Sequence, residues 1–291
     1  MAQRKGELSK RERFIKKAKE TIAEAFKSRD MVLSGVTKAI EEIQKVINVL
    51  TERFETWYEI YFPELKLDDR KKYVEVAITI DRASVETERI AKFVGRKKAE
   101  EIKELAKKSL GAELSERDKK ELFALGERIL SLYQLLNEYE EYQNELAREV
   151  APNISELAGP EIAAKLIAHV GSLKKLAIMP AGTIQVLGAE KALFKHLKNK
   201  KIAPPKHGII FQHPKISNSP KDVRGKIARA LANKIALAAK ADAFTKNFIA
   251  PKLKVDFEKR YAEILKIGKR EANEAPHFLG SSRRRGCSWK T

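Results

Sequence analysis

A ten-residue stretch, Gly188–Leu197, combines residue types that could bind an anion. Glycine followed by good helix formers predicts a helix that starts at Gly188. The free N–H groups of a helix start and the positive end of its dipole together attract phosphate. Glu190 lies in the predicted first turn, and Lys191 and Lys195 add charge one turn apart on one side. The stretch therefore predicts a phosphate site, although an ordinary amphipathic helix with solvated lysines has the same pattern.

The same stretch has an apolar face. Ala189, Leu193, Phe194 and Leu197 recur at i, i+4, i+5 and i+8, the spacing of one side of a helix. Ala189 is thus expected at the helix start, beside the predicted anion site.

Two further basic segments follow within the same half of the chain. Residues 199–220 form a predicted loop rich in Lys, Pro and His, and a helix is expected to begin near residue 221 with lysines and arginines beside its apolar positions. Side chains of this kind contact RNA backbones and unpaired bases. The candidate contacts in these segments are Lys206, His207, Arg224, Lys226 and Arg229. Gln185 and Glu190 could bond base edges or a partner protein, or Gln185 could satisfy nearby backbone groups.

The charge of the chain is divided unevenly. Residues 1–150 hold 31 Lys and Arg against 30 Asp and Glu, whereas residues 151–291 hold 28 against 10. A basic half joined to a neutral half points to a polyanionic partner, and nucleic acid is the commonest.

No set of residues suggests catalysis. The five histidines and the one cysteine lack metal-ligand spacing, and neither a Gly-x-Gly-x-x-Gly nor a Walker-type loop is present. We therefore expect no enzyme activity, no cofactor and no metal site. One cysteine excludes an internal disulfide, and no apolar run is long enough to span a membrane, so a soluble intracellular protein is expected.

Two heptad seams dominate the first half. One runs from Val36 to Tyr61 within a helix expected to start at the capping box Ser9–Glu12 and to stop at Pro63. The second runs from Leu122 to Val150, after a capping box at Ser115–Asp118. Such seams suggest an antiparallel pair or a seam shared with another chain, and we expect dimerisation through residues 36–150.

The segments between and after these seams are also predicted to be helical. They cover 69–94 and 96–108 in the first half, and then short helices rich in small residues from Pro160 onward. The expected fold class is all-α, with a long coiled-coil domain (1–155), a compact helical domain (156–273) and a disordered tail (274–291) for which a cloning origin is one explanation.

Five short stretches of the second half carry a family pattern: Gly159–Ile167, Gly171–Leu173, Pro180–Gln185, Gly188–Phe194 and Gly225–Arg229. They resemble the Nop domain family, and with the preceding seams the resemblance covers about residues 20–270. Within this family, the sequence is most similar to the archaeal Nop subunits of box C/D guide ribonucleoproteins, which direct 2′-O-methylation of RNA.

The resemblance implies a scaffold that dimerises through its coiled coil and binds box C/D guide RNA at a kink-turn already held by a kink-turn-binding protein. By position, Glu190 and Lys191 at the Gly188 helix start would wedge against the RNA stem, and Gln185 and Arg224 would contact RNA. Methyl transfer would belong to fibrillarin, a separate subunit. The expected location is cytoplasmic for an archaeal protein and nucleolar for a eukaryotic one.

Two departures from the family pattern qualify this picture. Gly182 stands where the family has serine, and the family's N-terminal fibrillarin-binding domain has no counterpart, so we expect an N-terminally truncated chain. A spliceosomal factor of the same family remains an alternative, as does a coiled-coil organiser with a non-specific basic domain.

Overall fold

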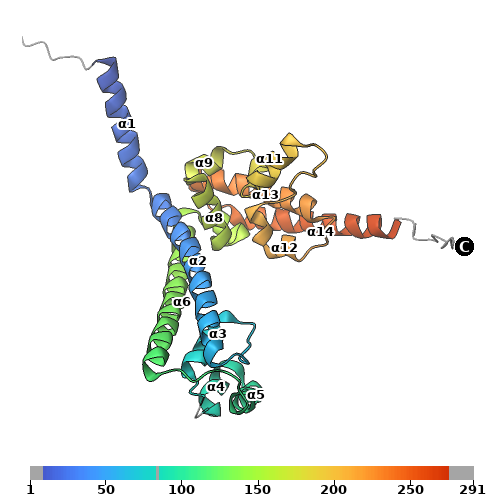
Figure 1. Cartoon of the computed structure of the whole chain (residues 1–291). Coiled ribbons are helices and arrows are strands. Elements are labelled where there is room, and N and C mark those ends of the chain that lie inside the picture. Colours follow the sequence, from blue (N-terminus) through green and yellow to red (C-terminus); the bar gives the residue numbers. More distant parts are fainter. Residues whose placement is uncertain (1–8, 83–84, 275–291) are drawn as a thin grey trace, which may run out of the picture. The chain divides into compact units, whose positions relative to one another are not determined.

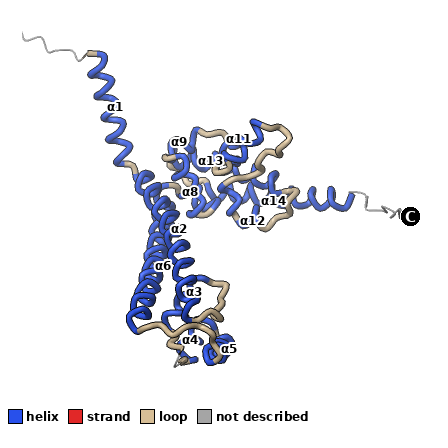
Figure 2. The backbone as a smooth tube through the Cα atoms, in the orientation of Figure 1, coloured by secondary structure: helices blue, strands red, loops and turns tan. Residues whose placement is uncertain are grey.

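A computed structural model describes residues 9–82 and 85–274 of the chain, and these residues form helices without any strand (Figure 2). The predicted all-α fold class is confirmed. The chain divides into two compact units, Met1–Ala147 and Arg148–Thr291. The division precedes the boundary expected near residue 155, because the helix that starts at Pro152 packs against helices of the second unit. The tail expected to be disordered lies, apart from Glu274, outside the described residues.

The first unit is built on two long antiparallel helices, with three shorter helices at one end of this pair and a further helix before it in the chain (Figure 1). The chain order is α1 (Lys10–Lys27), α2 (Arg29–Tyr61), α3 (Arg70–Thr79), α4 (Thr87–Val94), α5 (Arg96–Lys107) and α6 (Glu116–Val150).

The two heptad seams pack against each other within one chain. Ile40 and Ile47 of α2 are buried with Leu136 of α6, and the amide of Gln143 donates to the hydroxyl of Thr37 over 2.9 Å in the buried interface. Residues early in α2 thus meet residues late in α6, which makes the pair antiparallel. An antiparallel pair within the chain is one of the two arrangements that the seams allow.

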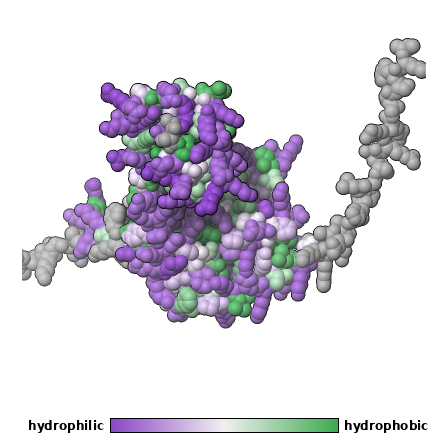
Figure 3. Space-filling model, turned by 90° about the horizontal axis from the view of Figure 1, so that it is seen from below, coloured by the Kyte–Doolittle hydropathy of each residue, from purple (hydrophilic) through white to green (hydrophobic). Residues whose placement is uncertain are grey.

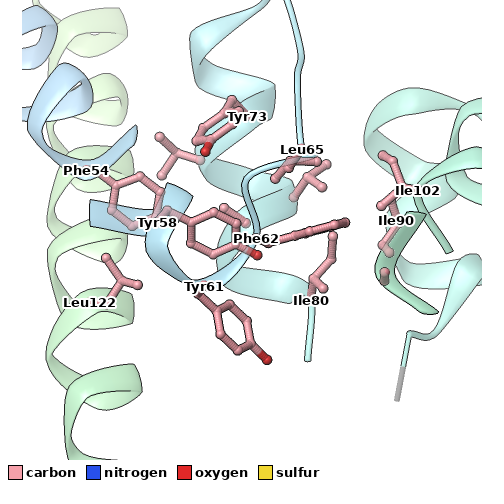
Figure 4. Close-up of a cluster of buried hydrophobic side chains, with 14 of the residues drawn as sticks. Phe54, Tyr58, Tyr61, Phe62, Leu65, Tyr73, Ile80, Ile90, Ile102 and Leu122 are labelled. Carbon is pink, nitrogen blue, oxygen red and sulfur yellow. The ribbon is translucent and has the colours of Figure 1, made fainter. Parts of the chain in front are cut away.

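An aromatic core joins this helix pair to α3, α4 and α5 (Figure 4). Phe54 and Tyr58 of α2 stack with ring centroids 5.7 Å apart, and Tyr73 of α3 meets both rings edge-on. Leu122 and Ile129 of α6 belong to the same buried cluster. Burial of such rings removes a large apolar area from water, which anchors the three short helices to the pair.

Two predicted helices of this unit are divided in the structure. The helix expected from Ser9 to Tyr61 is interrupted at Ser28, whose backbone is extended and whose hydroxyl donates to Asp30. Serine favours such local bonds over helical ones. The helix expected over 69–94 becomes α3 and α4, because Arg82 donates its backbone N–H to the Tyr61 hydroxyl and its guanidinium to the carbonyls of Tyr61 and Gly111.

The capping boxes predicted at two helix starts differ in outcome. Before α1, the Ser9 hydroxyl accepts from the N–H of Glu12 while the Glu12 carboxylate accepts from the N–H of Ser9, so this box is confirmed. Before α6, the Ser115 hydroxyl accepts from the N–H of Asp118, but it donates to the carboxylate of Asp118. Only half of the second box therefore forms.

The second unit packs its shorter helices around α13, the helix that contacts most of the others (Figure 1). Alanines such as Ala228 and Ala232 are fully buried and let neighbouring helices approach closely. The order is α7 (Pro152–Ala158), α8 (Pro160–Val170), α9 (Leu173–Ile178), α10 (Ala181–Val186), α11 (Glu190–Lys198), the 3-10 turn η1 (Ile209–Gln212), α12 (Pro214–Ser217), α13 (Arg224–Lys240), the π-turn η2 (Ala241–Thr245) and α14 (Ala250–Glu274).

Candidate nucleic-acid interface

The helix predicted to start at Gly188 starts two residues later, at Glu190. Gly188 has φ +86°, and a Cβ there would lie 2.7 Å from Cγ1 of Ile209, so the turn before α11 requires glycine. The backbone N–H of Gly188 donates to Oε1 of Glu190 over 2.7 Å. A carboxylate of the chain itself thus occupies one of the donors that we expected to be available for phosphate.

Glu190 also ties α11 to α8. Its Oε1 lies 2.8 Å from Nε2 of His169, the residue before the end of α8. Partial burial alone would raise the pKa of Glu190, but the N–H groups of Gly188 and Glu190 and the His169 ring outweigh it, and the net pKa is lowered. Glu190 is therefore a charged clamp that sets the position of the α11 start.

The remaining surface of α11 faces solvent. None of its residues is buried, and Lys191 and Lys195 are exposed. Phe194 and Leu197, on the predicted apolar face, are 61% and 53% exposed. Figure 3 shows other hydrophobic residues scattered over a mainly hydrophilic surface. The helix thus presents both lysines and an apolar side to solvent.

Gln185 lies behind this surface rather than on it. It is 8% exposed, and its side-chain amide donates to the carbonyl of Lys206 over 2.8 Å and to that of Gly225 over 3.5 Å. The same residue accepts from the N–H of Gly208 through its backbone carbonyl. Gln185 therefore joins the 199–220 loop to the start of α13, the backbone role that the sequence left open.

His207 and Arg224 meet at one aromatic ring. The His207 ring stacks on Phe211 with centroids 4.4 Å apart, and the Arg224 guanidinium lies over Phe211 at 5.4 Å. Arg224 also donates from Nε to the carbonyl of Ser219 and from Nη2 to that of Ser217. Burial and the nearby Arg224 charge lower the pKa of His207, which favours a neutral ring. This cluster holds the loop against the start of α13.

A basic groove of about 890 Å³ lies between residues 203–206, α13 and α14. Lys206, Lys226 and Arg229 line it together with Gln185, so the structure brings these four predicted residues together. Apolar side chains such as Leu237 and Ile264 line it as well. A groove with cationic and apolar walls can hold a phosphate-linked chain.

Two cations of the groove were missed in the sequence. Lys234 pairs with Asp256 over 2.9 Å, and Arg260 of α14 pairs with Glu263 over 2.8 Å. Arg260 lies 31 residues after Arg229, and only the packing of α13 against α14 makes them line one groove. In the sequence, only the recurring basic residues of α14 could have indicated that Arg260 belongs to a basic surface.

The predicted contacts thus form three sets. Gly188, Ala189, Glu190, Lys191 and Lys195 belong to the start and surface of α11. Gln185, Lys206, Lys226 and Arg229 line the groove, and His207 and Arg224 both contact the Phe211 ring. Among the described residues, no group of His, Cys, Asp and Glu is arranged to hold a metal ion, and no helix is long and apolar enough to cross a membrane.

Comparison with known proteins assigns this arrangement to a family. Residues 39–263 match the family model Nop, described as snoRNA binding domain, fibrillarin. An uncharacterized NOP5 family protein of Methanocaldococcus jannaschii is 43% identical over 249 residues, which cover 84% of this chain and 60% of the relative. Nucleolar protein 58 of Neurospora crassa is 35% identical over 217 residues, 74% of this chain and 36% of the relative.

A solved structure of the same family name also matches this chain. A chain of the crystal structure of a fibrillarin/Nop5p complex matches with a TM-score of 0.51 and 28% identity, covering 87% of this chain and 78% of that one. The chain spans 60% or less of the length of the two curated relatives. Because the family model matches residues 39–263, most of the chain, the chain belongs to the Nop family.

Proposed function

We propose that the chain is an RNA-binding scaffold of a box C/D guide ribonucleoprotein that directs 2′-O-methylation of RNA. The match of residues 39–263 to a snoRNA-binding family carries the proposal. The basic second half and the groove between α13 and α14 support it physically. Methyl transfer would be performed by fibrillarin, and this chain would hold RNA and protein partners in place.

The contacts proposed with RNA differ in kind. Lys191 and Lys195 on α11 and Lys206, Lys226 and Arg229 along the groove would contact phosphates, because these cations lie at the surface. Gln185, Glu190 and Arg224 would act by holding the elements that carry those cations, since each makes several bonds within the chain. The α11 start would still meet the RNA stem, with Gly188 and Ala189 allowing close approach.

The exposed apolar side of α11 favours a protein partner beside the RNA. Phe194 and Leu197 are next to the lysines of the same helix, so a single partner surface made of protein and RNA would cover both kinds of side chain. We propose that this composite surface is a kink-turn RNA held by its kink-turn-binding protein. Fibrillarin is proposed as a further partner because the matched solved structure is of a fibrillarin/Nop5p complex.

Dimerisation is proposed through the first unit, but not through the seams. The seam residues pack against each other within the chain, whereas Val46, Val49 and Ile60 of α2 are exposed. Val46 and Ile60 are two heptads apart, so they lie on one stripe of the helix. A second copy that covers this stripe would form the proposed coiled-coil dimer.

The decisive experiment is a gel shift with kink-turn RNA, with and without the kink-turn-binding protein. We expect the chain to bind tightly only when the kink-turn RNA and the kink-turn-binding protein are both present. The affinity should fall steeply as the salt concentration rises, because phosphate contacts release counterions. Equal binding to kink-turn RNA and to an unrelated RNA of the same length would reduce the chain to a non-specific basic protein and reject the proposal.

A further inference from the structure

The turn between α13 and α14 is strained and unusually well anchored. It consists of residues 241–249, which begin as the π-turn η2. Lys246 has φ +59°, the only positive φ outside glycine in residues 9–82 and 85–274, and its N–H donates to the carbonyl of Ala241 over 2.7 Å. A side chain in this left-handed region is unfavourable and persists only where the surroundings enforce it.

Two buried polar side chains enforce the conformation of this turn. Asn153 donates from Nδ2 to the carbonyl of Asn247, and its Oδ1 accepts from the N–H groups of Ile249 and Ala250. Asp242 accepts from the side chain and backbone N–H of Asn153 over 2.7 and 3.1 Å. Both Asn153 and Asp242 are 1% exposed. The turn is therefore held to the start of α7 by a complete network of hydrogen bonds.

This rigid turn displays two aromatic rings. Phe244 and Phe248 are 60% and 61% exposed, in a unit that buries comparable rings such as Phe257. Lys240, Lys246 and Lys252, which stand before, between and after the two rings in the chain, are exposed, and the one acidic residue of residues 241–249, Asp242, is buried. Helix α9, which packs against η2, adds the exposed Lys174 and Lys175. The surface combines flat apolar rings with a local excess of positive charge.

We propose that the Phe244–Phe248 turn is a stacking platform for unpaired RNA nucleotides. Exposed aromatic rings stack on bases, and neighbouring lysines neutralise the phosphates between them, which is how proteins bind single strands. Paired bases offer no free faces, so a duplex would not use the rings. An acidic peptide would be attracted by the lysines but would leave the two flat rings without matching partners.

The platform lies beyond one end of the groove. Lys226 and Lys240 lie fourteen residues apart on α13, about 21 Å at a rise of 1.5 Å per residue, and Leu237, three residues before Lys240, still lines the groove. The inference rests on the proposed RNA-binding function, since the same RNA would supply the unpaired segment. Such a segment would leave the structured RNA at the groove and reach the turn at the other end of α13.

The test uses a single-stranded oligoadenylate of about ten nucleotides that carries one 2-aminopurine. Substitution of both rings, Phe244→Ala with Phe248→Ala, should weaken its binding at least about tenfold, since stacking contributes strongly for each base. It should also abolish the fluorescence change that stacking gives, without altering the salt dependence. Lys240→Gln should instead reduce the salt dependence, and Phe248→Trp should retain binding.

Phe14→Ala is the matched control, because this ring is exposed on α1 of the other unit. Helicity and melting temperature should stay unchanged in all variants. Unchanged affinity of the double variant for oligoadenylate would overturn the proposal of a stacking platform. This would hold even if the double variant lost binding to a protein partner. The proposed function would still stand if kink-turn binding remained sensitive to Lys191→Ala. A chain that binds neither oligoadenylate nor kink-turn RNA would overturn both the platform and the proposed function.

Discussion

Arg224 and Phe211 form a cation–π contact that joins the start of α13 to the 199–220 loop. The guanidinium carbon lies 5.4 Å from the centroid of the Phe211 ring, while Nε and Nη2 donate to the carbonyls of Ser219 and Ser217 over 2.7 and 2.9 Å. One side chain at the first residue of α13 thus orders both the aromatic turn and the chain just before the helix. Its planar group, and not its charge alone, makes this possible.

Arg224→Ala should therefore destabilise the second unit as well as weaken RNA binding. The loss of two hydrogen bonds from a charged donor predicts a free energy of unfolding lower by about 2–4 kcal/mol, measured by chemical denaturation. Arg224→Lys should restore little of this, because an ammonium group cannot span both carbonyls and stack on the ring. Weakened RNA binding with unchanged stability would show instead that Arg224 contacts RNA directly.

Lys191→Ala tests the proposed contact at the α11 start. Lys191 is exposed in the first turn, so its removal should leave helicity unchanged and weaken binding to the complex of RNA and kink-turn protein. The slope of log affinity against log salt should fall by about one unit for one lost phosphate contact. Lys103→Ala, on α5 of the neutral half, is the control and should change little. Equal affinities for the two variants would contradict the assignment.

Ile129→Asp separates folding of the first unit from dimerisation. Ile129 is fully buried among aromatic rings of its own chain, so an unpaired carboxylate there should cost several kcal/mol and unfold the helix pair.

Val49→Asp is the matched variant, because Val49 lies on the outer side of α2 and is 66% exposed. Circular dichroism should show full helicity for Val49→Asp and a loss for Ile129→Asp. Sedimentation should show a monomer for Val49→Asp if the outer side of α2 forms the dimer. An unaltered dimer in this variant would move the interface elsewhere.

The lowered pKa of Glu190 predicts that the stability of the second unit depends on pH. Its pKa is lowered in the folded chain from the ordinary value of 4.5, so the charged carboxylate stabilises the second unit fully above about pH 4.5. This contribution is lost as the pH falls through the lowered pKa. Glu190→Gln should lower the melting temperature near pH 7, and the difference from the native chain should shrink as the pH approaches 3. A difference that stays constant over this range would exclude the charge as the cause.

The sequence by itself determined the features that depend on neighbours along the chain. The capping box of Ser9 and Glu12 forms because both partners lie within one turn, and the helix before Pro63 stops because proline lacks a donor. The concentration of positive charge after residue 150 was equally readable. So was the family resemblance, which rests on short stretches of local sequence.

Only the tertiary structure decided which distant groups meet. Heptad periodicity fixes an apolar face but not its partner, and the structure shows the Leu136 side of α6 packed on Ile40 and Ile47 of α2. Gln185 and Arg224 looked like RNA contacts because their types suit RNA, yet their donors are used by backbone carbonyls that folding brings to them. Glu190 likewise meets His169 from 21 residues away. A polar side chain bonds the nearest partners in space, and helix packing, not spacing along the chain, sets which partners are near.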